Sequence, residues 1–216
     1  MGVAEGHQQD IDFAAMLCSR VCHDMANSIL ALSAGLEFLE ESSDSEMHQE
    51  ATGLLKSSTE KITARLQYAR LAYGASGSAG AELDLRQVTE VLDGIAQFEK
   101  PEFVWDVPME LLEKNKAKIL LNLANITLGC LPRGGKIYVK MTTSPFQIAL
   151  VANGKMVKVQ EDAVDILLGK KSDSQNNVYN IQAYYTNKLA AIIGADIGVE
   201  KSDTCLLYTS PSPRDA

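Results

Sequence analysis

The chain has 216 residues, 46% of them hydrophobic, so it can bury one good core or two small ones without metals or disulfides. Its 28 acidic and 20 basic residues give a net charge of -8, which argues against nucleic acid or an anionic membrane as the main partner. No apolar run is long enough to span a bilayer, and the first ten residues lack the apolar centre of a secretion signal. We therefore expect a cytoplasmic protein with reduced cysteines that binds another protein or a small ligand.

The first predicted element is a long helix from about Asp10, as its N-cap, to about Glu41, after a disordered N-terminus over residues 1–9. On its helical wheel His23 points away from a stripe of apolar and small residues. We therefore expect an exposed imidazole on a helix whose opposite face is packed against other parts of the protein. We call that stripe the packing stripe, and it consists of Ile11, Ala14, Cys18, Val21, Met25, Ile29, Leu32, Leu36 and Leu39.

A second amphipathic helix is predicted from Glu46 to Tyr73, after a turn in the polar cluster at residues 42–45. Two long helices with a short connection predict an antiparallel hairpin over residues 10–75. A hairpin of this size cannot cover its own apolar stripe, so we expect two copies to form a dimeric four-helix bundle. The alternative is a monomer in which the C-terminal half covers the stripe.

A glycine-rich linker is expected at residues 76–83, and the chain changes character after it. Residues 84–204 are predicted to form a two-layer α/β sandwich, which makes the whole chain an α+β protein. The predicted helices cover residues 85–98, 108–130, 160–168 and 178–193, with Pro108 as the first residue of the second one. The predicted strands cover residues 103–107, 136–143 and 146–152, with a turn at residues 132–135 and a final strand after residues 194–203.

The last segment, CLLYTSPSPRDA at residues 205–216, continues no pattern of the chain. It resembles a translated sequencing adapter, so we predict a non-native tail without function. The sheet is then expected to lack part of an edge strand.

The chemistry of the first helix centres on His23 and its neighbours. A histidine that accepts a phosphoryl group needs a neutral ring nitrogen aimed at phosphorus, and a partner for the other ring N–H fixes the tautomer. Asp24 is placed to be that partner. Arg20 and Asn27, one turn to either side, are expected on the same exposed side, where they could steady phosphate oxygens or the carboxylates of a partner.

The surface around His23 is predicted to bind a protein, because it carries small or apolar residues where a solvated helix would have Lys and Glu. We call it the His23 face and define it by Met16, Ser19, Arg20, Ala26 and Leu30. Two alternatives stay open: an exposed His beside an Asp is often only surface, and the second domain could cover this face.

The segment LCSRVCHDMANSILALSAGLEFLEE and the PRGG turn resemble the ChpT-type histidine phosphotransferases, and the resemblance extends over residues 10–203. It implies a dimeric hairpin similar to the phosphotransfer domain of sensor kinases, followed by a degenerate kinase ATP-binding domain. It also implies that His23 is phosphorylated with Asp24 as its acidic neighbour. The spacing to Asn27 is similar to a kinase motif that supports phosphotransfer and phosphatase chemistry.

The stretch from Leu120 to Val139 resembles a kinase N-box, in which the second asparagine binds magnesium. Asn122 matches the first asparagine, but Ile126 stands at the metal position and cannot bind Mg²⁺, which prefers oxygen ligands. Asn125 would fit only a shifted register. We therefore expect no cofactor in this chain, with Mg²⁺ supplied by the partner. Arg133, Lys136 and Lys140 are interpreted as solvated.

The predicted function is a phosphorelay histidine phosphotransferase that carries a phosphoryl group on His23. It would pass the group from the receiver-domain aspartate of a hybrid kinase to that of response regulators in a two-component system. The resemblance implies that one such regulator is a cell-cycle transcription factor. The alternatives are an autophosphorylating histidine kinase with an atypical ATP site and a non-catalytic dimeric adaptor.

Overall fold

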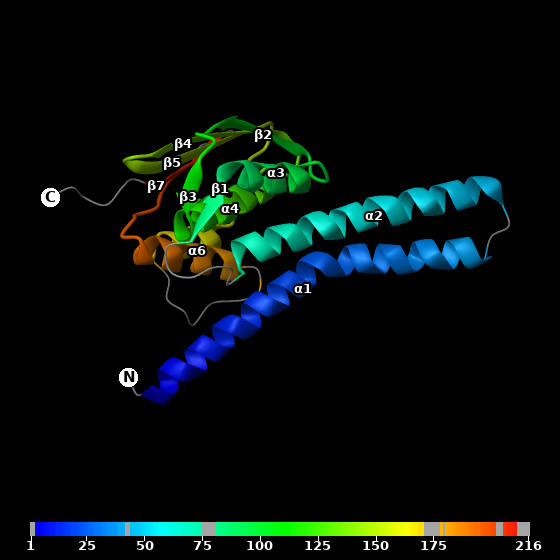
Figure 1. Cartoon of the computed structure of the whole chain (residues 1–216), viewed down its shortest axis with the longest axis horizontal. Coiled ribbons are helices and arrows are strands. Elements are labelled where there is room, and N and C mark those ends of the chain that lie inside the picture. The colour runs from blue at the N-terminus through cyan, green and yellow to red at the C-terminus, as the bar shows by residue number, and fades with distance from the viewer. Residues whose placement is uncertain are drawn as a thin grey trace. The chain divides into compact units, whose positions relative to one another are not determined.

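A computed structural model describes residues 3–41, 44–74, 81–170, 178, 180–201 and 205–210, without the side chains of residues 3–5 and 205–210 (Figure 1). The chain divides into a first unit, Met1–Ala69, and a second unit, Arg70–Ala216. Among the described residues no helix is long and apolar enough to cross a membrane.

The first unit is a helical hairpin of α1 (Val3–Glu41) and most of α2 (Ser45–Ala72). The two helices approach closely at Gly35, where an added Cβ atom would lie 3.0 Å from the Cγ atom of Leu55 and 3.5 Å from the Ala51 carbonyl oxygen. Gly35, Ala51, Ser28 and Ser58 are all buried. Small residues therefore allow close contact between α1 and α2, which confirms the predicted hairpin.

The packing stripe is a different face of α1 and lies largely at the surface of the single chain. Ile11, Ile29 and Leu36 expose 62%, 51% and 54% of their area. On the helical wheel these residues lie away from Ser28 and Gly35, so the hairpin does not bury them.

The N-terminal prediction is wrong for residues 3–9, which belong to α1. This stretch contains Ala, Glu and Gln, which favour a helix and extend it with only Gly6 as a weak point. Asp10 therefore lies inside the helix and is not its N-cap. Residues 42–43 of the predicted turn are outside the described part of the chain, while the Asp44 carboxylate accepts the Glu46 backbone N–H at 2.9 Å at the start of α2.

The second unit contains a five-stranded sheet in the order β2-β4-β5-β7-β6, in which β2 and β4 are parallel and the other pairs are antiparallel. Its strands are β2 (Pro101–Asp106), β4 (Gly135–Thr143), β5 (Phe146–Asn153), β6 (Gly198–Lys201) and β7 (Cys205–Ser210). Two short strands, β1 (Glu82–Asp84) and β3 (Leu111–Glu113), form a separate antiparallel pair.

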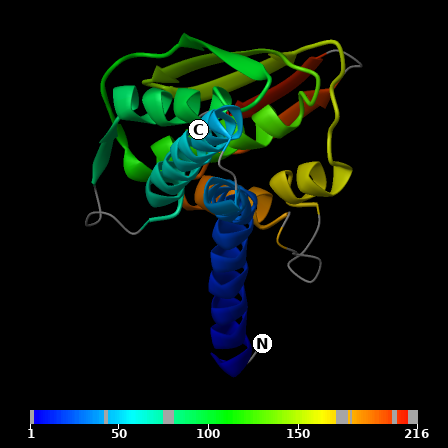
Figure 2. The ribbon, with the colours of Figure 1, turned by 90° about the vertical axis from the view of Figure 1, so that its right-hand side faces the viewer.

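One face of the five-stranded sheet packs on helices, and Figure 2 shows these helices as a layer along one side. They are α3 (Leu85–Ala96), α4 (Lys114–Gly129), α5 (Glu161–Leu167) and α6 (Ile181–Ile192). Alternate residues of β4 and β5 are buried, including Ile137, Val139, Ile148 and Leu150. This alternation is typical of a sheet with one covered face, and it confirms the predicted two-layer α/β sandwich.

Three boundaries of the second unit differ from prediction. The helix expected from Pro108 begins only at Lys114, because residues 111–113 pair with β1 and Glu113 caps α4 by accepting the Asn115 backbone N–H at 2.9 Å. For the same reason residues 82–83, the end of the predicted linker, belong to the strand β1. Residues 76–80 of that linker lie outside the described residues.

The third difference concerns the C-terminal end of the second unit, where residues 198–201, predicted as part of a turn before the final strand, form β6. Residues 205–210 form β7, which pairs with β5 on one side and β6 on the other. The expectation of an incomplete edge strand is therefore wrong, since this segment supplies an interior strand. That residues 205–216 are non-native stays a prediction, and residues 211–216 lie outside the described part.

Candidate functional site

His23 lies on α1 with its imidazole at the surface, as predicted, and 50% of its side chain is exposed. The Nδ1 atom of its ring lies 3.6 Å from Oδ1 of Asp24, whose side chain is only 17% exposed. The nitrogen nearer the carboxylate is thus Nδ1. This is the arrangement in which a carboxylate can orient the ring and leave Nε2 as the reactive nitrogen.

The second oxygen of Asp24 is engaged by Arg20, whose Nε donates to Asp24 Oδ2 at 3.0 Å. The two residues are one helical turn apart, where oppositely charged side chains meet. Only 18% of the Arg20 side chain is exposed, so this residue is less exposed than predicted. The pair therefore holds the Asp24 carboxylate in place beside His23. Arg20, which was expected to contact a phosphate, already binds Asp24 through its Nε atom.

The remaining predicted site residues lie around His23 on the same helix. Asn27, Ser19 and Ala26 are exposed, and Leu30 exposes 68% of its area. Met16 is partly buried. The structure thus brings the members of the His23 face together with Asn27 as a surface that combines apolar and polar groups.

The cysteines of α1 are not joined in a disulfide: Cys18 and Cys22 are exposed free thiols, while Cys130 is buried in the second unit. In the described part of the chain, no group of three or more His, Cys, Asp or Glu side chains could hold a metal ion.

The asparagines of the N-box-like stretch are part of a buried polar network. The Asn122 amide donates to the Lys118 carbonyl at 2.8 Å, and its oxygen accepts from Gln182 Nε2 at 3.2 Å. The Asn125 amide donates to Gln182 Oε1 at 3.1 Å. Asn122 is fully buried and Asn125 is 8% exposed. Both side chains therefore link α4 to Gln182 of α6, including the one that a shifted register would have assigned to magnesium.

Sequence reasoning missed Lys118, a cation that is only 5% exposed. Its Nζ atom donates to the Gly74 carbonyl oxygen at 2.8 Å and to the Tyr185 hydroxyl at 3.2 Å. Burial, followed by repulsion from Lys114, lowers the pKa of Lys118 to about 8. No local pattern marks this residue, because its partners are 44 and 67 residues away in the chain.

Comparison with known proteins identifies the class. Residues 85–205 match the family described as the histidine phosphotransferase C-terminal domain. Protein phosphotransferase ChpT of Brucella abortus (strain 2308) is 36% identical over 203 residues, which are 93% of this chain and 95% of the relative. A solved structure of a bacterial phosphotransferase has a TM-score of 0.84 and 34% identity, covering 93% of this chain and 96% of the other. These matches define a histidine phosphotransferase.

Within that class, the chain belongs to the ChpT-type phosphotransferases of phosphorelay signalling. The family resemblance of the α1 segment is therefore confirmed, and so are the predicted transferase activity and the overall fold class.

Proposed function

We propose that His23 carries the phosphoryl group, taking it from the aspartyl phosphate of one receiver domain and passing it to the aspartate of another. The observation that carries this proposal is the half-exposed imidazole on α1, with Nδ1 facing the Asp24 carboxylate at 3.6 Å. In a histidine phosphotransferase, an accessible and oriented imidazole is the group that the reaction requires.

In the proposed step, Nε2 of neutral His23 attacks the phosphorus of the acyl phosphate. The N–P bond forms, the P–O bond to the receiver carboxyl breaks, and the carboxylate leaves with the bonding electrons. The Nδ1 proton stays on the ring, and the Asp24 carboxylate balances the positive charge that the ring gains. Transfer to the next receiver reverses these changes. Both phosphoryl compounds are reactive, so the protein contributes mainly alignment of the reacting groups.

Two polar side chains support this site in the proposal. Arg20 fixes Asp24 through the 3.0 Å bond from its Nε atom, and Asn27 lies one turn beyond His23 to steady phosphate oxygens. The Mg²⁺ that the reaction needs is supplied by the acidic pocket of the receiver. The hydrogen bonds that join Asn122 and Asn125 to Gln182 support a chain without a nucleotide cofactor, since both amides are used to pack α4 against α6.

The proposed docking site for the receiver is the His23 face. Leu30 is the most exposed large apolar residue of α1 in this region, and Ala26 and Ser19 add small side chains beside the imidazole. An exposed apolar patch next to a reactive group is a feature of protein-binding surfaces. Hybrid kinases and response regulators are the proposed owners of these receivers, with a cell-cycle regulator among them. The relay would act in the cytoplasm, where Cys18 and Cys22 stay reduced.

The packing stripe supports a homodimer through a four-helix bundle. Exposed Ile29 and Leu36 would be buried in such an interface. Sedimentation of the full chain should give a dimer, and Leu36→Glu should shift it toward monomer. Phe38→Glu is the matched control, because Phe38 is similarly exposed but lies off the stripe. A wild-type monomer, or equal effects of both variants, would contradict the dimer.

The transfer itself is tested with a receiver domain that carries a radiolabelled aspartyl phosphate. The wild type and His48→Ala should gain acid-labile, alkali-stable label, whereas His23→Ala should gain none. Label on His23→Ala would refute the assignment to His23. If no label reaches the wild type, the protein is an adaptor, and if labelled ATP alone labels it, the protein is a kinase.

A further inference from the structure

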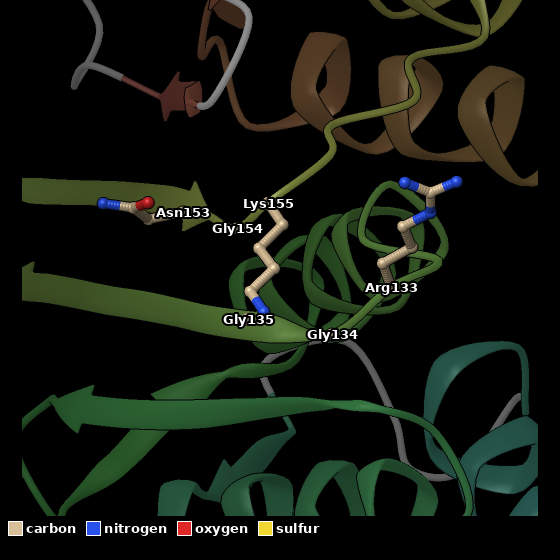
Figure 3. Close-up of a pocket in the computed structure, with 6 residues that line it drawn as sticks. All are labelled: Arg133, Gly134, Gly135, Asn153, Gly154 and Lys155. Carbon is tan, nitrogen blue, oxygen red and sulfur yellow. The ribbon is translucent and has the colours of Figure 1, made fainter.

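A pocket of about 580 Å³ lies in the second unit where β4 begins and β5 ends, and Figure 3 shows its lining residues. The lining consists of Arg133, Gly134, Gly135, Asn153, Gly154 and Lys155. This volume lies within the range of small-molecule sites. The lining contains no apolar side chain larger than glycine, however, so a mainly apolar ligand would have little to bury against. The pocket is therefore suited to a polar or charged ligand.

Its floor consists of closely packed backbone that only glycine permits. Gly134 has φ = 85° and Gly135 has φ = 146°, which are conformations that other residues rarely adopt. A side chain on Gly135 would overlap the Asn153 carbonyl, and a Cβ atom on Gly154 would lie 2.6 Å from the Gly134 carbonyl oxygen. The three glycines thus let the start of β4 and the end of β5 pack closely at the base of the pocket, and they add no side chain to its lining.

The charge of the pocket is positive although the chain as a whole carries -8. The Lys155 side chain extends toward Gly135, and Arg133 stands on the other side of the turn (Figure 3). Neither cation forms an ion pair with a described residue. Two further lysines lie near these glycines. Lys136 follows Gly135 directly in β4, and the Lys100 backbone carbonyl oxygen would lie 3.2 Å from a Cβ atom added on Gly134.

From these observations we propose that the pocket at residues 133–135 and 153–155 binds a small phosphate-bearing anion. A guanidinium group and an ammonium group that line one pocket supply the positive charge and the hydrogen-bond donors that a phosphate or diphosphate group requires. A cation would be repelled, and an apolar peptide would find no apolar lining. All six lining residues belong to the second unit, and the proposal does not depend on the proposed transfer reaction.

The test follows pyrophosphate binding to the full-length chain by NMR of the backbone amides, with the ionic strength held constant by sodium chloride. The Gly134, Gly135 and Gly154 amide signals should shift to saturation. Arg133→Gln combined with Lys155→Gln should weaken binding by at least about tenfold, because charge-assisted bonds to phosphate are lost. Arg86→Gln combined with Lys140→Gln is the charge-matched control and should bind like the wild type, because those cations pair with Asp84 and Asp106.

Three results would overturn the proposal. The first is the absence of saturable shifts at the three glycines. The second is equal weakening by both double variants, which would indicate nonspecific attraction to surface charge. The third is saturable binding of a hexaglutamate peptide at the same glycines without binding of pyrophosphate, which would assign the pocket to acidic protein segments.

Discussion

Lys118 gives the chain a distinctive dependence of stability on pH. Its pKa is about 8 in the folded protein, compared with 10.5 for a free lysine. Below pH 8 the side chain is charged in both states, and folding bears the cost of burying the charge. As the pH rises above the folded pKa, the folded protein releases the proton while the unfolded chain still binds it. The free energy of unfolding must therefore rise with pH in this window.

The expected size follows from the two pKa values. Between about pH 7 and about pH 9.5 the contribution of Lys118 to the free energy of unfolding should increase by about 2 kcal/mol. The contacts of Lys118 can persist in the neutral form, since an amine still donates to the Gly74 carbonyl oxygen. Burial raises the pKa of Tyr185 to about 12, so its hydroxyl stays protonated throughout this range.

The assay is urea unfolding of the wild type and Lys118→Met at a series of pH values. The other ionisable groups are the same in both proteins, so their contributions cancel in the difference. The wild type should gain about 2 kcal/mol relative to Lys118→Met across this window. A difference that stays constant with pH, or that changes in the opposite direction, would refute the assignment of a lowered pKa to Lys118.

Three further predictions concern other parts of the chain. Asp24→Asn should slow phosphoryl transfer by about tenfold to a hundredfold without changing the helix content, because the ring loses its orienting charge; equal transfer rates would remove Asp24 from the mechanism. Gly35→Leu should destabilise the hairpin by about 1–3 kcal/mol in urea unfolding because of contact with Leu55. A Cβ atom added at Gly53 would meet no other atom within 4 Å, so Gly53→Leu should instead stabilise the hairpin. Similar effects of the two substitutions on the free energy of unfolding would contradict the close approach at Gly35. Finally, burial raises the pKa of Asp93, which accepts a hydrogen bond from Trp105 Nε1 at 3.0 Å. The fluorescence of Trp105, the single tryptophan, should therefore change with pH at values above the usual pKa range of Asp. Asp93→Asn should abolish that change.

The sequence allowed good prediction of elements whose pattern is local. The periodic apolar residues of α3 and the alternating residues of β4 and β5 identified those elements to within two residues, because each pattern records one buried face. The short strand β3 was missed because three residues carry little pattern, and it forms only by pairing with β1. The place of residues 205–210 between β5 and β6 was missed for the same reason, since strand pairing joins distant parts of the chain.

At the site, the sequence placed Arg20 and Asn27 on the same side of α1 as the exposed His23, gave Asp24 as the neighbour of its ring, and correctly identified the family. It did not predict that Arg20 would be tied to Asp24 and only partly accessible. It also left the shifted register of Asn125 open, because its bond to Gln182 depends on contact between α4 and α6.

The sequence by itself determined that His23 lies opposite the packing stripe, because the rotation per residue of a helix is a local property of the backbone. Only the tertiary structure decided which polar groups are buried or gathered together, as in Lys118 against Gly74 and Tyr185, or Arg133 and Lys155 around the glycine floor. Burial and charge clustering arise from contacts between residues far apart in the chain, and helical or strand periodicity carries no information about those contacts.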